Sequence, residues 1–336
     1  MNSQDFLSPW IKRFLLEYLI SIKNLSLNTQ HSYRDTFRLC LPFISKQVKK
    51  PIDKLNIHDM SADKVKKFLL LLESERKCSL ATRNQRLAAI YAFVNFVGLN
   101  SPEHLEWCRQ IKQIPFKKTK KNLITYLEKT EMDALLNAPD QKTTQGKRDY
   151  ALLLFLYNTG ARADEVAQLI IADLNIANAT KRDFSTVIIK GKGNKLRRCP
   201  LWQQTAVELL ELIDKRALSA NVFLNRYGQP LTRFGIHTMV KRYVKQLTYQ
   251  YPSLSKKRIS PHTIRHTTAT HLLRAGVDIN TIRAWLGHVS INTTNIYAEV
   301  DLEMKAKALA CCEVIVNKHT ATWRENKDLM SFLDAL

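Results

Sequence analysis

Apolar side chains recur at helical spacing through the first hundred residues of the chain. The repeat runs over positions 6–19 and returns over positions 33–43, after the polar segment SLNTQ. Apolar positions three or four residues apart form one face of a helix, so both segments are predicted to be helical. Two further helices are expected to start near Ser61 and Ser79, because a serine before an apolar repeat caps a helix N-terminus. With the last of them ending at Gly98, the pattern predicts a small module of four helices.

The pattern changes in the second half of the chain. Helices are expected from Thr130, with that threonine as N-cap, and over 148–157, with a stop at Thr159 and Gly160. The segment STVIIKGKGNKLRRCPL then reads as two short strands around a pair of glycines, which predicts a β-hairpin. Helical spacing returns over 205–218 and continues toward the end. The predicted fold class is therefore mainly α with a small β-hairpin or sheet.

Residues 111–121 interrupt the helical pattern. The stretch IKQIPFKKTKK contains one proline, five lysines and no acid. Such a stretch is typical of an interdomain linker, either a solvated tether or a strap that crosses a phosphate backbone. The predicted organisation is a helical domain over 1–110, a basic linker over 111–124, a second domain over 125–300 and a C-terminal tail over 301–336.

The charge balance indicates a polyanionic partner. Lys and Arg total 52 and Asp and Glu total 30, which gives a net charge of +22 at pH 7. A field of this sign and size attracts nucleic acid. The six cysteines form no CxxC pair and no metal-like spacing with histidine, so no metal site is expected. The longest uncharged run is too short to span a bilayer, and MNSQDF has no signal-peptide pattern; a cytoplasmic protein without a membrane anchor is expected.

Four fragments carry candidate chemistry: TGARADE (159–165), IIKGKGNK (188–195), SPHTIRH (260–266) and LGHVSINTTNIY (286–297). Taken singly, each has an ordinary structural explanation, such as a surface arginine, a hairpin turn, a polar helix N-terminus or a boundary tyrosine. Together, in order and spacing, they resemble the active site of the tyrosine recombinase (phage-integrase-like) family. The resemblance implies an α+β catalytic domain. It extends to SLNTQHSYRDTFRLCLPF and SLATRNQRLAAIYAFVNFV, which look like the family's helical core-binding (SAM-like) domain.

The family pattern can be carried over residue by residue, with no catalytic position substituted. The positions that match the first arginine, the hairpin lysine, the His-x-x-Arg pair, the LGH histidine and the nucleophile are Arg162, Lys192, His262, Arg265, His288 and Tyr297. The resemblance implies a 3′-phosphotyrosine intermediate and a free 5′-hydroxyl. It also implies double-stranded DNA with specific recombination sites as partner, held as paired duplexes by a tetramer.

The chemistry expected of these residue types fits that pattern. Two guanidiniums can hold the non-bridging oxygens of a phosphodiester through paired N–H bonds, without a metal. Attack by a tyrosine conserves the energy of the diester for rejoining, so neither ATP nor another cofactor is expected. A phenol with a pKa of about 10 needs a base, and His262 is the candidate. Lys192 can protonate the leaving oxygen, with Lys190 and Lys195 as rivals.

Other basic residues are candidates for DNA contact. Arg83 and Arg86 lie on the fourth predicted helix and either enter a groove or form a solvated basic face. Glu165 is expected to orient its neighbours, and His266 and His271 to be packing or helix-surface residues. The lysines expected to contact phosphates are Lys117, Lys118, Lys120, Lys121, Lys190 and Lys195.

The tail carries an apolar stripe on a segment of nearly zero charge. Its members, at largely helical spacing, are Trp323, Leu329, Met330, Phe332, Leu333 and Leu336. This segment either covers its own domain or docks on a second copy of the chain, as the family resemblance implies. We predict docking in trans.

Two other functions use the same features. A type IB topoisomerase shares the residue set but relaxes supercoils as a monomer, and a non-catalytic architectural protein would use only the basic clamp. The tail and the separate helical module favour a recombinase over the first, and the complete catalytic set disfavours the second. The reaction could serve integration, excision, transposition or chromosome resolution.

Overall fold

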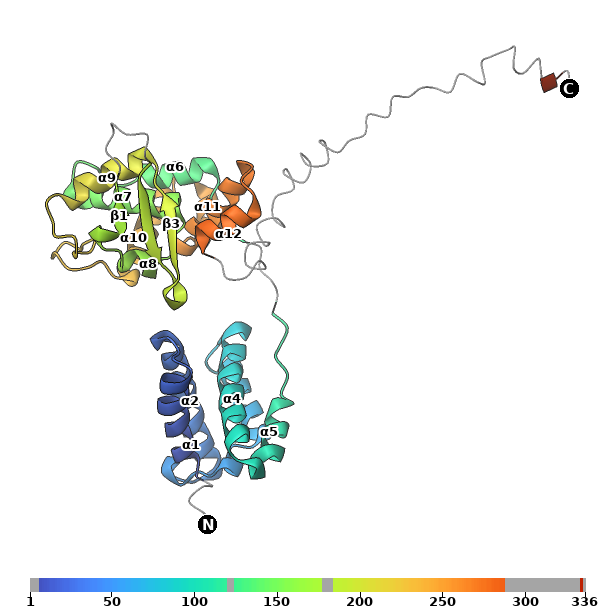
Figure 1. Ribbon diagram of the computed structural model, residues 1–336. Helices are drawn as coiled ribbons and strands as arrows, with labels where there is room; N and C mark the ends of the chain where they lie inside the picture. Colours follow the sequence, from blue (N-terminus) through green and yellow to red (C-terminus); the bar gives the residue numbers. More distant parts are fainter. Residues whose placement is uncertain (1–5, 120–123, 177–183, 288–332, 335–336) are drawn as a thin grey trace. The chain divides into compact units, whose positions relative to one another are not determined.

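The computed structural model describes residues 6–119, 124–176, 184–287 and 333–334, except for the side chain of Lys192. The chain divides into two compact units, residues 1–122 and 123–336 (Figure 1). Apart from residues 333–334, the tail predicted over 301–336 lies outside the described residues. Over the described part of the chain, no helix combines the length and the apolar character that crossing a bilayer requires.

The first unit is helical. Ser61 and Ser79 cap the third and fourth helices as expected, each accepting a hydrogen bond from a backbone N–H three residues on. Its core is built from the apolar faces of all these helices and is rich in aromatic rings around Phe14. The elements are α1 (Leu7–Arg13), a π-helical segment η2 (Phe14–Ile22), α2 (Leu27–Val48), α3 (Ala62–Ser74), α4 (Leu80–Asn100) and α5 (Leu105–Lys112), with short 3₁₀ turns at Ile52–Lys54, Ile57–Asp59 and Pro102–His104.

The prediction of four helices in this unit is wrong, because α5 adds another. It has only eight residues and follows a turn that begins at Pro102. Its apolar face nevertheless buries Trp107, Cys108 and Ile111 against the core. A helix this short gains its stability from packing, which its own sequence pattern does not reveal.

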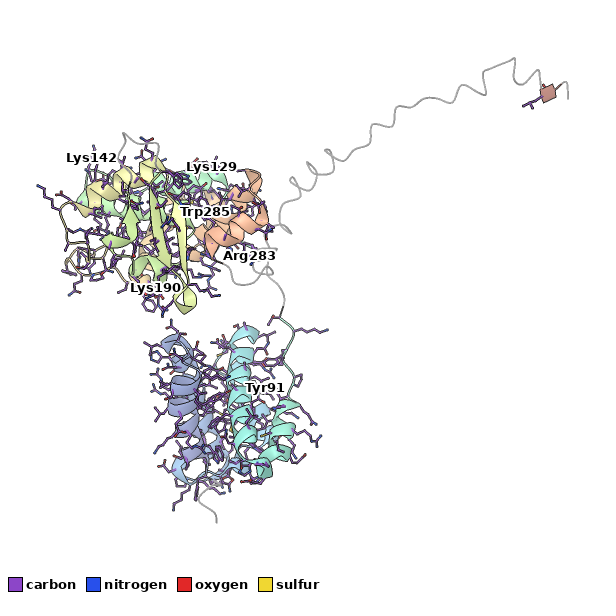
Figure 2. All side chains as sticks on the ribbon, viewed as in Figure 1. Tyr91, Lys129, Lys142, Lys190, Arg283 and Trp285 are labelled. Atoms are coloured by element: carbon purple, nitrogen blue, oxygen red, sulfur yellow. The ribbon has the colours of Figure 1, made fainter. Side chains whose placement is uncertain are left out.

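The first part of the predicted linker is fastened to α4. The phenol of Tyr91 donates to the carbonyl of Lys112 at 2.7 Å (Figure 2). Asn84 exchanges two hydrogen bonds with the backbone of Lys117, donating at 2.8 Å and accepting at 3.1 Å. Up to Lys117 the segment therefore follows the helix surface and is not a solvated tether.

The second unit packs helices around a small antiparallel sheet of order β1-β2-β3. The predicted hairpin is confirmed as β2 (Thr186–Lys190) and β3 (Leu196–Pro200), and the short strand β1 (Leu174–Asn175) pairs with β2. The helices are α6 (Lys129–Asn137), α7 (Thr144–Thr159), α8 (Ala163–Ala167), α9 (Gln203–Ile213), α10 (Arg233–Leu247), α11 (Pro261–Arg274) and α12 (Ile279–Leu286), with 3₁₀ turns at Ile171–Asp173, Lys192–Asn194 and Pro252–Lys256.

Helix α7 is the centre of this unit. Its residues 151–159 are all buried, and α9 and α11 pack against it. It starts four residues before the predicted Arg148, because Thr143 provides its N-cap, and it ends at Gly160 as predicted. The predicted Thr130 cap is wrong, because Thr130 lies inside α6 and the N-cap position is held by Glu128. The backbone N–H of Glu128 donates to the carboxylate of Glu131 at 2.8 Å.

Candidate active site

Arg162 lies in the turn between α7 and α8. Gly160 ends α7 in the left-handed conformation at φ +59°, and Arg162 takes the N-cap position of α8. The guanidinium of Arg162 donates to Glu165 Oε1 at 2.7 Å, and its backbone N–H donates to the other carboxylate oxygen at 2.9 Å. The half-buried side chain is therefore held by a buried carboxylate one helical turn away.

The beginning of α11 supplies a histidine and a second arginine. Ser260 caps this helix and Pro261 occupies its first position, so His262 and Arg265 lie three residues apart on one face. Arg265 is only 1% exposed. Its guanidinium donates to the carbonyl of Gly160 at 2.7 Å and to the carbonyl of Leu286 at 2.6 Å. It thereby joins the turn before Arg162 to the end of α12.

His262 lies near both arginines, because Arg265 on the same helix bonds the carbonyl of Gly160, two residues before Arg162. Burial lowers the pKa of His262, and the positive charges of Arg265 and Arg162 lower it further. A neutral imidazole is therefore placed among cations, where an anion is favoured and a proton can be accepted. The structure brings Arg162, His262 and Arg265 into one cluster, and their catalytic roles stay predictions.

The two other histidines of α11 have packing contacts. The rings of His262 and His266 lie edge to face with centroids 4.3 Å apart. Burial, His262 and Arg265 lower the pKa of His266 to about 4, so that ring is neutral at pH 7. His271 Nδ1 forms a hydrogen bond of 2.7 Å with the phenol of Tyr157. Both therefore fit the structural role expected from the sequence.

The lysines of the hairpin lie at and beside its turn. Lys192 begins the 3₁₀ turn between β2 and β3, which is closed by a hydrogen bond from the N–H of Gly191 to the carbonyl of Lys195 at 2.8 Å. Lys190, which is labelled in Figure 2, ends β2 and is exposed. Lys195 is also exposed. The hairpin thus carries three lysines within six residues.

His288 and Tyr297 lie outside the described residues. The last described position before them is Gly287, which ends α12 in the left-handed conformation at φ +67°. Helix α12 is held to α7 by the indole of Trp285, which donates to the carbonyl of Asn158 at 3.2 Å. His288 therefore follows directly on a helix end that is fixed beside the arginine cluster.

Arg197 also belongs to this cluster, although the sequence reasoning did not select it. It lies on β3, its side chain is 8% exposed, and it donates to Glu165 Oε2 at 2.7 Å. A signal was available, because alternation in a strand places Arg197 on the same face as Cys199, and a free cysteine is expected to be buried. An arginine on the buried face of a strand needs a partner there.

The candidates for DNA contact differ in their surroundings. Arg83 is 5% exposed, and its guanidinium donates to the carbonyl of Pro115 at 2.9 Å and lies 3.6 Å from Glu73. Both alternatives predicted for Arg83, entry into a groove and a solvated basic face, are therefore corrected, because this buried arginine holds the linker on α4. Arg86 donates to the carbonyl of Ser32 at 3.0 Å and is half-buried.

The linker lysines also differ. The ammonium of Lys117 is paired with Glu73 at 2.8 Å, whereas Lys118 is exposed. Lys120 and Lys121 lie outside the described residues. Contacts from Arg86, these four linker lysines, Lys190 and Lys195 to DNA stay predictions.

Replacing Gly160 with alanine is expected to destabilise the second unit by about 1–3 kcal/mol. A Cβ there would lie 2.5 Å from Leu286 Cδ2, at a backbone conformation that L side chains rarely adopt. Gly228→Ala is the matched control, because Gly228 has φ +74° and its added Cβ would meet nothing within 4 Å. Urea unfolding of both variants measures the difference, and equal losses would contradict a clash at Leu286.

Comparison with known proteins places this geometry in context. Residues 125–304 match the model of the phage integrase family, and residues 11–98 match the phage integrase N-terminal SAM-like domain. The chain is 35% identical over its whole length to the whole of a putative integrase/recombinase, y4rC, of Sinorhizobium fredii. It is 30% identical to tyrosine recombinase XerC of Pelobacter propionicus, over 87% of this chain and 91% of the relative.

Solved structures share the fold at low identity. The Tn1549 transposon integrase in complex with transposon right end DNA has a TM-score of 0.67 at 18% identity, covering 90% of this chain and 99% of that one. XerH site-specific recombinase bound to its difH substrate has a TM-score of 0.63 at 22% identity, covering 93% and 91%.

Proposed function

The chain belongs to the phage integrase family of tyrosine recombinases, and from that premise we propose that it cuts and rejoins DNA at specific sites through Tyr297. It is a site-specific recombinase, an enzyme of strand cleavage and ligation. The observation that carries the assignment of its active site is the cluster of Arg162, His262 and Arg265 beside the helix end that leads to His288.

The arginine cluster supports stabilisation of a phosphate under attack. Negative charge builds up on the non-bridging oxygens in the transition state, and fixed cations in a site with little water stabilise that charge strongly. Arg162 is oriented by Glu165, and Arg265 by two backbone carbonyls, so little reorganisation is needed when DNA binds. In this proposal His288 donates a further hydrogen bond to the same oxygens.

Tyr297 supplies the nucleophile. Its phenolic oxygen forms a bond to phosphorus while the bond from phosphorus to the 5′-oxygen breaks, which leaves a 3′-phosphotyrosine and a 5′-hydroxyl. The phenol proton passes to neutral His262, and Lys192 protonates the departing 5′-oxygen. Rejoining is the reverse reaction with a new 5′-hydroxyl, and it needs neither a metal nor ATP.

The role of His262 predicts a particular pH dependence. Because burial, Arg265 and Arg162 lower its pKa, His262 of the free enzyme stays neutral at pH 7 and becomes protonated only below its ordinary value of 6.5. The second-order rate constant for cleavage should therefore be flat near pH 7 and fall only below pH 6.5. Single-turnover cleavage at subsaturating protein from pH 4.5 to 8 measures this. An acid limb centred at or above the ordinary histidine value, or one that persists in His262→Gln, would contradict the assignment.

The partner that we propose is duplex DNA in a synapse of four copies of this chain. The net charge of +22 supports DNA as the partner, and XerH and the Tn1549 integrase were solved bound to DNA. We place the activity in the cytoplasm, with the DNA. Recombination joins the strands of one DNA site to the strands of another, so two duplexes must be held at once. An assembly of several protomers provides this.

The C-terminal stripe is the proposed contact between protomers. Deleting residues 318–336 should leave the affinity for a single DNA site unchanged and abolish pairing of two sites, because the stripe is expected to dock in trans. Gel-shift assays on one duplex and on two labelled duplexes separate these effects. Intact recombination by the shortened chain would reject this role of the tail.

The experiment that tests the function begins with the DNA site. Duplexes are selected from a random-sequence pool by binding to Tyr297→Phe, and the recovered sequence is placed once or twice in a supercoiled plasmid. The wild-type chain is expected to form an adduct that survives denaturant and to yield recombinant plasmids only with two sites, whereas Tyr297→Phe forms neither. Relaxed circles without recombinants would instead indicate a topoisomerase, and binding without any adduct an architectural protein.

A further inference from the structure

We propose that Arg197 is a positioning residue for cleavage: from β3 it holds the carboxylate that orients Arg162 and, at the same time, the backbone that leads into His288. The inference rests on the function proposed above. The side chain of Arg197 is 8% exposed, and its Nε and Nη2 are bound by acceptors of the protein itself. Its influence on the reaction would therefore pass through the groups it holds.

The first of these groups is Glu165. One carboxylate oxygen accepts from Arg162 at 2.7 Å and the other accepts from Arg197, also at 2.7 Å. The carboxylate is 5% exposed, so its pair with the buried Arg197 is shielded from solvent, whereas the Arg162 side chain is 38% exposed. Because Glu165 is held from both sides, its position and that of the Arg162 guanidinium depend on Arg197.

The second group is the end of α12, which lies beside β3 (Figure 1). Arg197 Nε donates to the carbonyl of Trp285 at 3.0 Å. A Cβ on Gly287 would lie 3.1 Å from Arg197 Cδ, so the backbone of the last residue before His288 rests on this side chain (Figure 2 labels Trp285). Arg197 thus holds the backbone at the end of α12 in place.

Strand β3, on which Arg197 lies, is also one of the two strands of the lysine hairpin. Arg197 pairs with Ile189 across the β2–β3 ladder, and a Cβ on Gly191 would lie 3.4 Å from Arg197 Nη1. Gly191 is the residue before Lys192. The side chain of Arg197 therefore contacts the segments that bear Arg162, Lys192 and His288, three positions far apart in the sequence.

Only a guanidinium satisfies this geometry. It is planar and presents donors in several fixed directions, so Nη2 and Nε can serve Glu165 and Trp285 together. A lysine has one nitrogen at the end of a flexible stem and cannot hold both acceptors in fixed positions. Arg197→Lys should therefore keep the charge but lose much of the positioning.

The test compares Arg197→Met and Arg197→Lys with Arg198→Met, whose exposed side chain belongs to the opposite face of the same strand. The duplex selected with Tyr297→Phe is the substrate, and covalent adduct is followed in a single turnover, together with DNA affinity and thermal unfolding. We expect both Arg197 variants to bind DNA with unchanged affinity and to form adduct about 10- to 100-fold more slowly. Arg198→Met should match the wild type.

Two further measurements separate positioning from a merely structural role. A methylphosphonate at the cleavage position carries no charge on its non-bridging oxygens, so it should shrink the defect of Arg197→Met, as it should for Arg162→Ala. A substrate with sulfur at the 5′-bridging position, whose sulfur leaves without a proton, should leave the defect of Arg197→Met unchanged. When Arg197→Met is combined with Glu165→Gln, the losses in cleavage rate should be far from additive, because both substitutions remove the same contact between Arg197 and Glu165.

Several outcomes would overturn the inference. They are a wild-type rate in both Arg197 variants, a loss of rate matched by loss of DNA affinity, or a defect that methylphosphonate leaves unchanged. If Arg197→Met fails to unfold cooperatively, Arg197→Lys alone decides in the same assays. Failure of the wild-type chain to form any adduct would instead reject the proposed function, and is distinguished by that control.

Discussion

Replacing Arg265 with alanine is expected to slow formation of the covalent adduct by about 10²–10³-fold, the usual cost of one donor to a developing oxyanion. The affinity for DNA should change little, since most of it comes from many phosphate contacts. The physical reason is that Arg265 is a buried cation fixed by the carbonyls of Gly160 and Leu286. Single-turnover cleavage of the selected duplex measures the effect.

The control for this prediction lies on the same helix. Arg274 forms a more exposed ion pair with Glu128 at 2.9 Å, a kind of pair that contributes roughly 0–1 kcal/mol, so Arg274→Ala should cleave at the wild-type rate. Arg265→Lys keeps the charge but cannot hold both carbonyls, and should lie between alanine and wild type. A rate for Arg265→Ala close to that of Arg274→Ala would remove Arg265 from the catalytic set.

Replacing Glu165 with alanine is expected to have the largest effect on stability, about 3–5 kcal/mol, because it leaves buried positive charge without its partner. Glu165 is 5% exposed and is shared by Arg162 and Arg197. Hydrogen exchange of peptides from residues 144–176 during urea unfolding reports on this unit without interference from the other. Asp164→Ala is the control, since the exposed Asp164 accepts from the exposed Gln168 at 3.2 Å.

The ionisation of Glu165 predicts an acid limb, that is, a fall in the free energy of unfolding as the pH is lowered. Burial by itself raises the pKa of Glu165, but the hydrogen bond and charge of Arg197 and the hydrogen bonds from Arg162 outweigh burial and lower this pKa below its ordinary value of 4.5. The unfolded state therefore binds the proton more readily than the folded state. The stability that Glu165 contributes is complete above pH 4.5 and is lost as the pH falls through the folded pKa. Glu165→Gln should flatten this limb; an unchanged limb would contradict the argument.

Local sequence rules predicted several elements well. Ser61 and Ser79 cap helices as expected, and Gly160 ends one. The alternation around KGKGNK predicted the hairpin with its lysines at the turn. These features depend on capping groups, left-handed glycine and strand alternation, which act over a few residues and so are visible in any short stretch.

Contacts between distant segments were not visible in the same way. Arg83 was selected as a basic residue on a helix, yet it is buried under the linker because Pro115 and Glu73 lie over it. Helix α5 has too few residues for a recognisable repeat, and its stability comes from the core on which it packs. In both cases the deciding partner lies far along the sequence or on another element.

By itself, the amino-acid sequence determined the chemical inventory of this protein: the cations, the histidines, the hairpin lysine and a tyrosine, in the order of a recombinase, on a strongly basic chain. Only the tertiary structure decided which of them meet. It placed Arg265 on the carbonyls of Gly160 and Leu286, and Arg197 between Glu165 and Trp285. The reason is that periodicity fixes which face of an element a side chain occupies, whereas its neighbours across that face are fixed by packing between segments many residues apart.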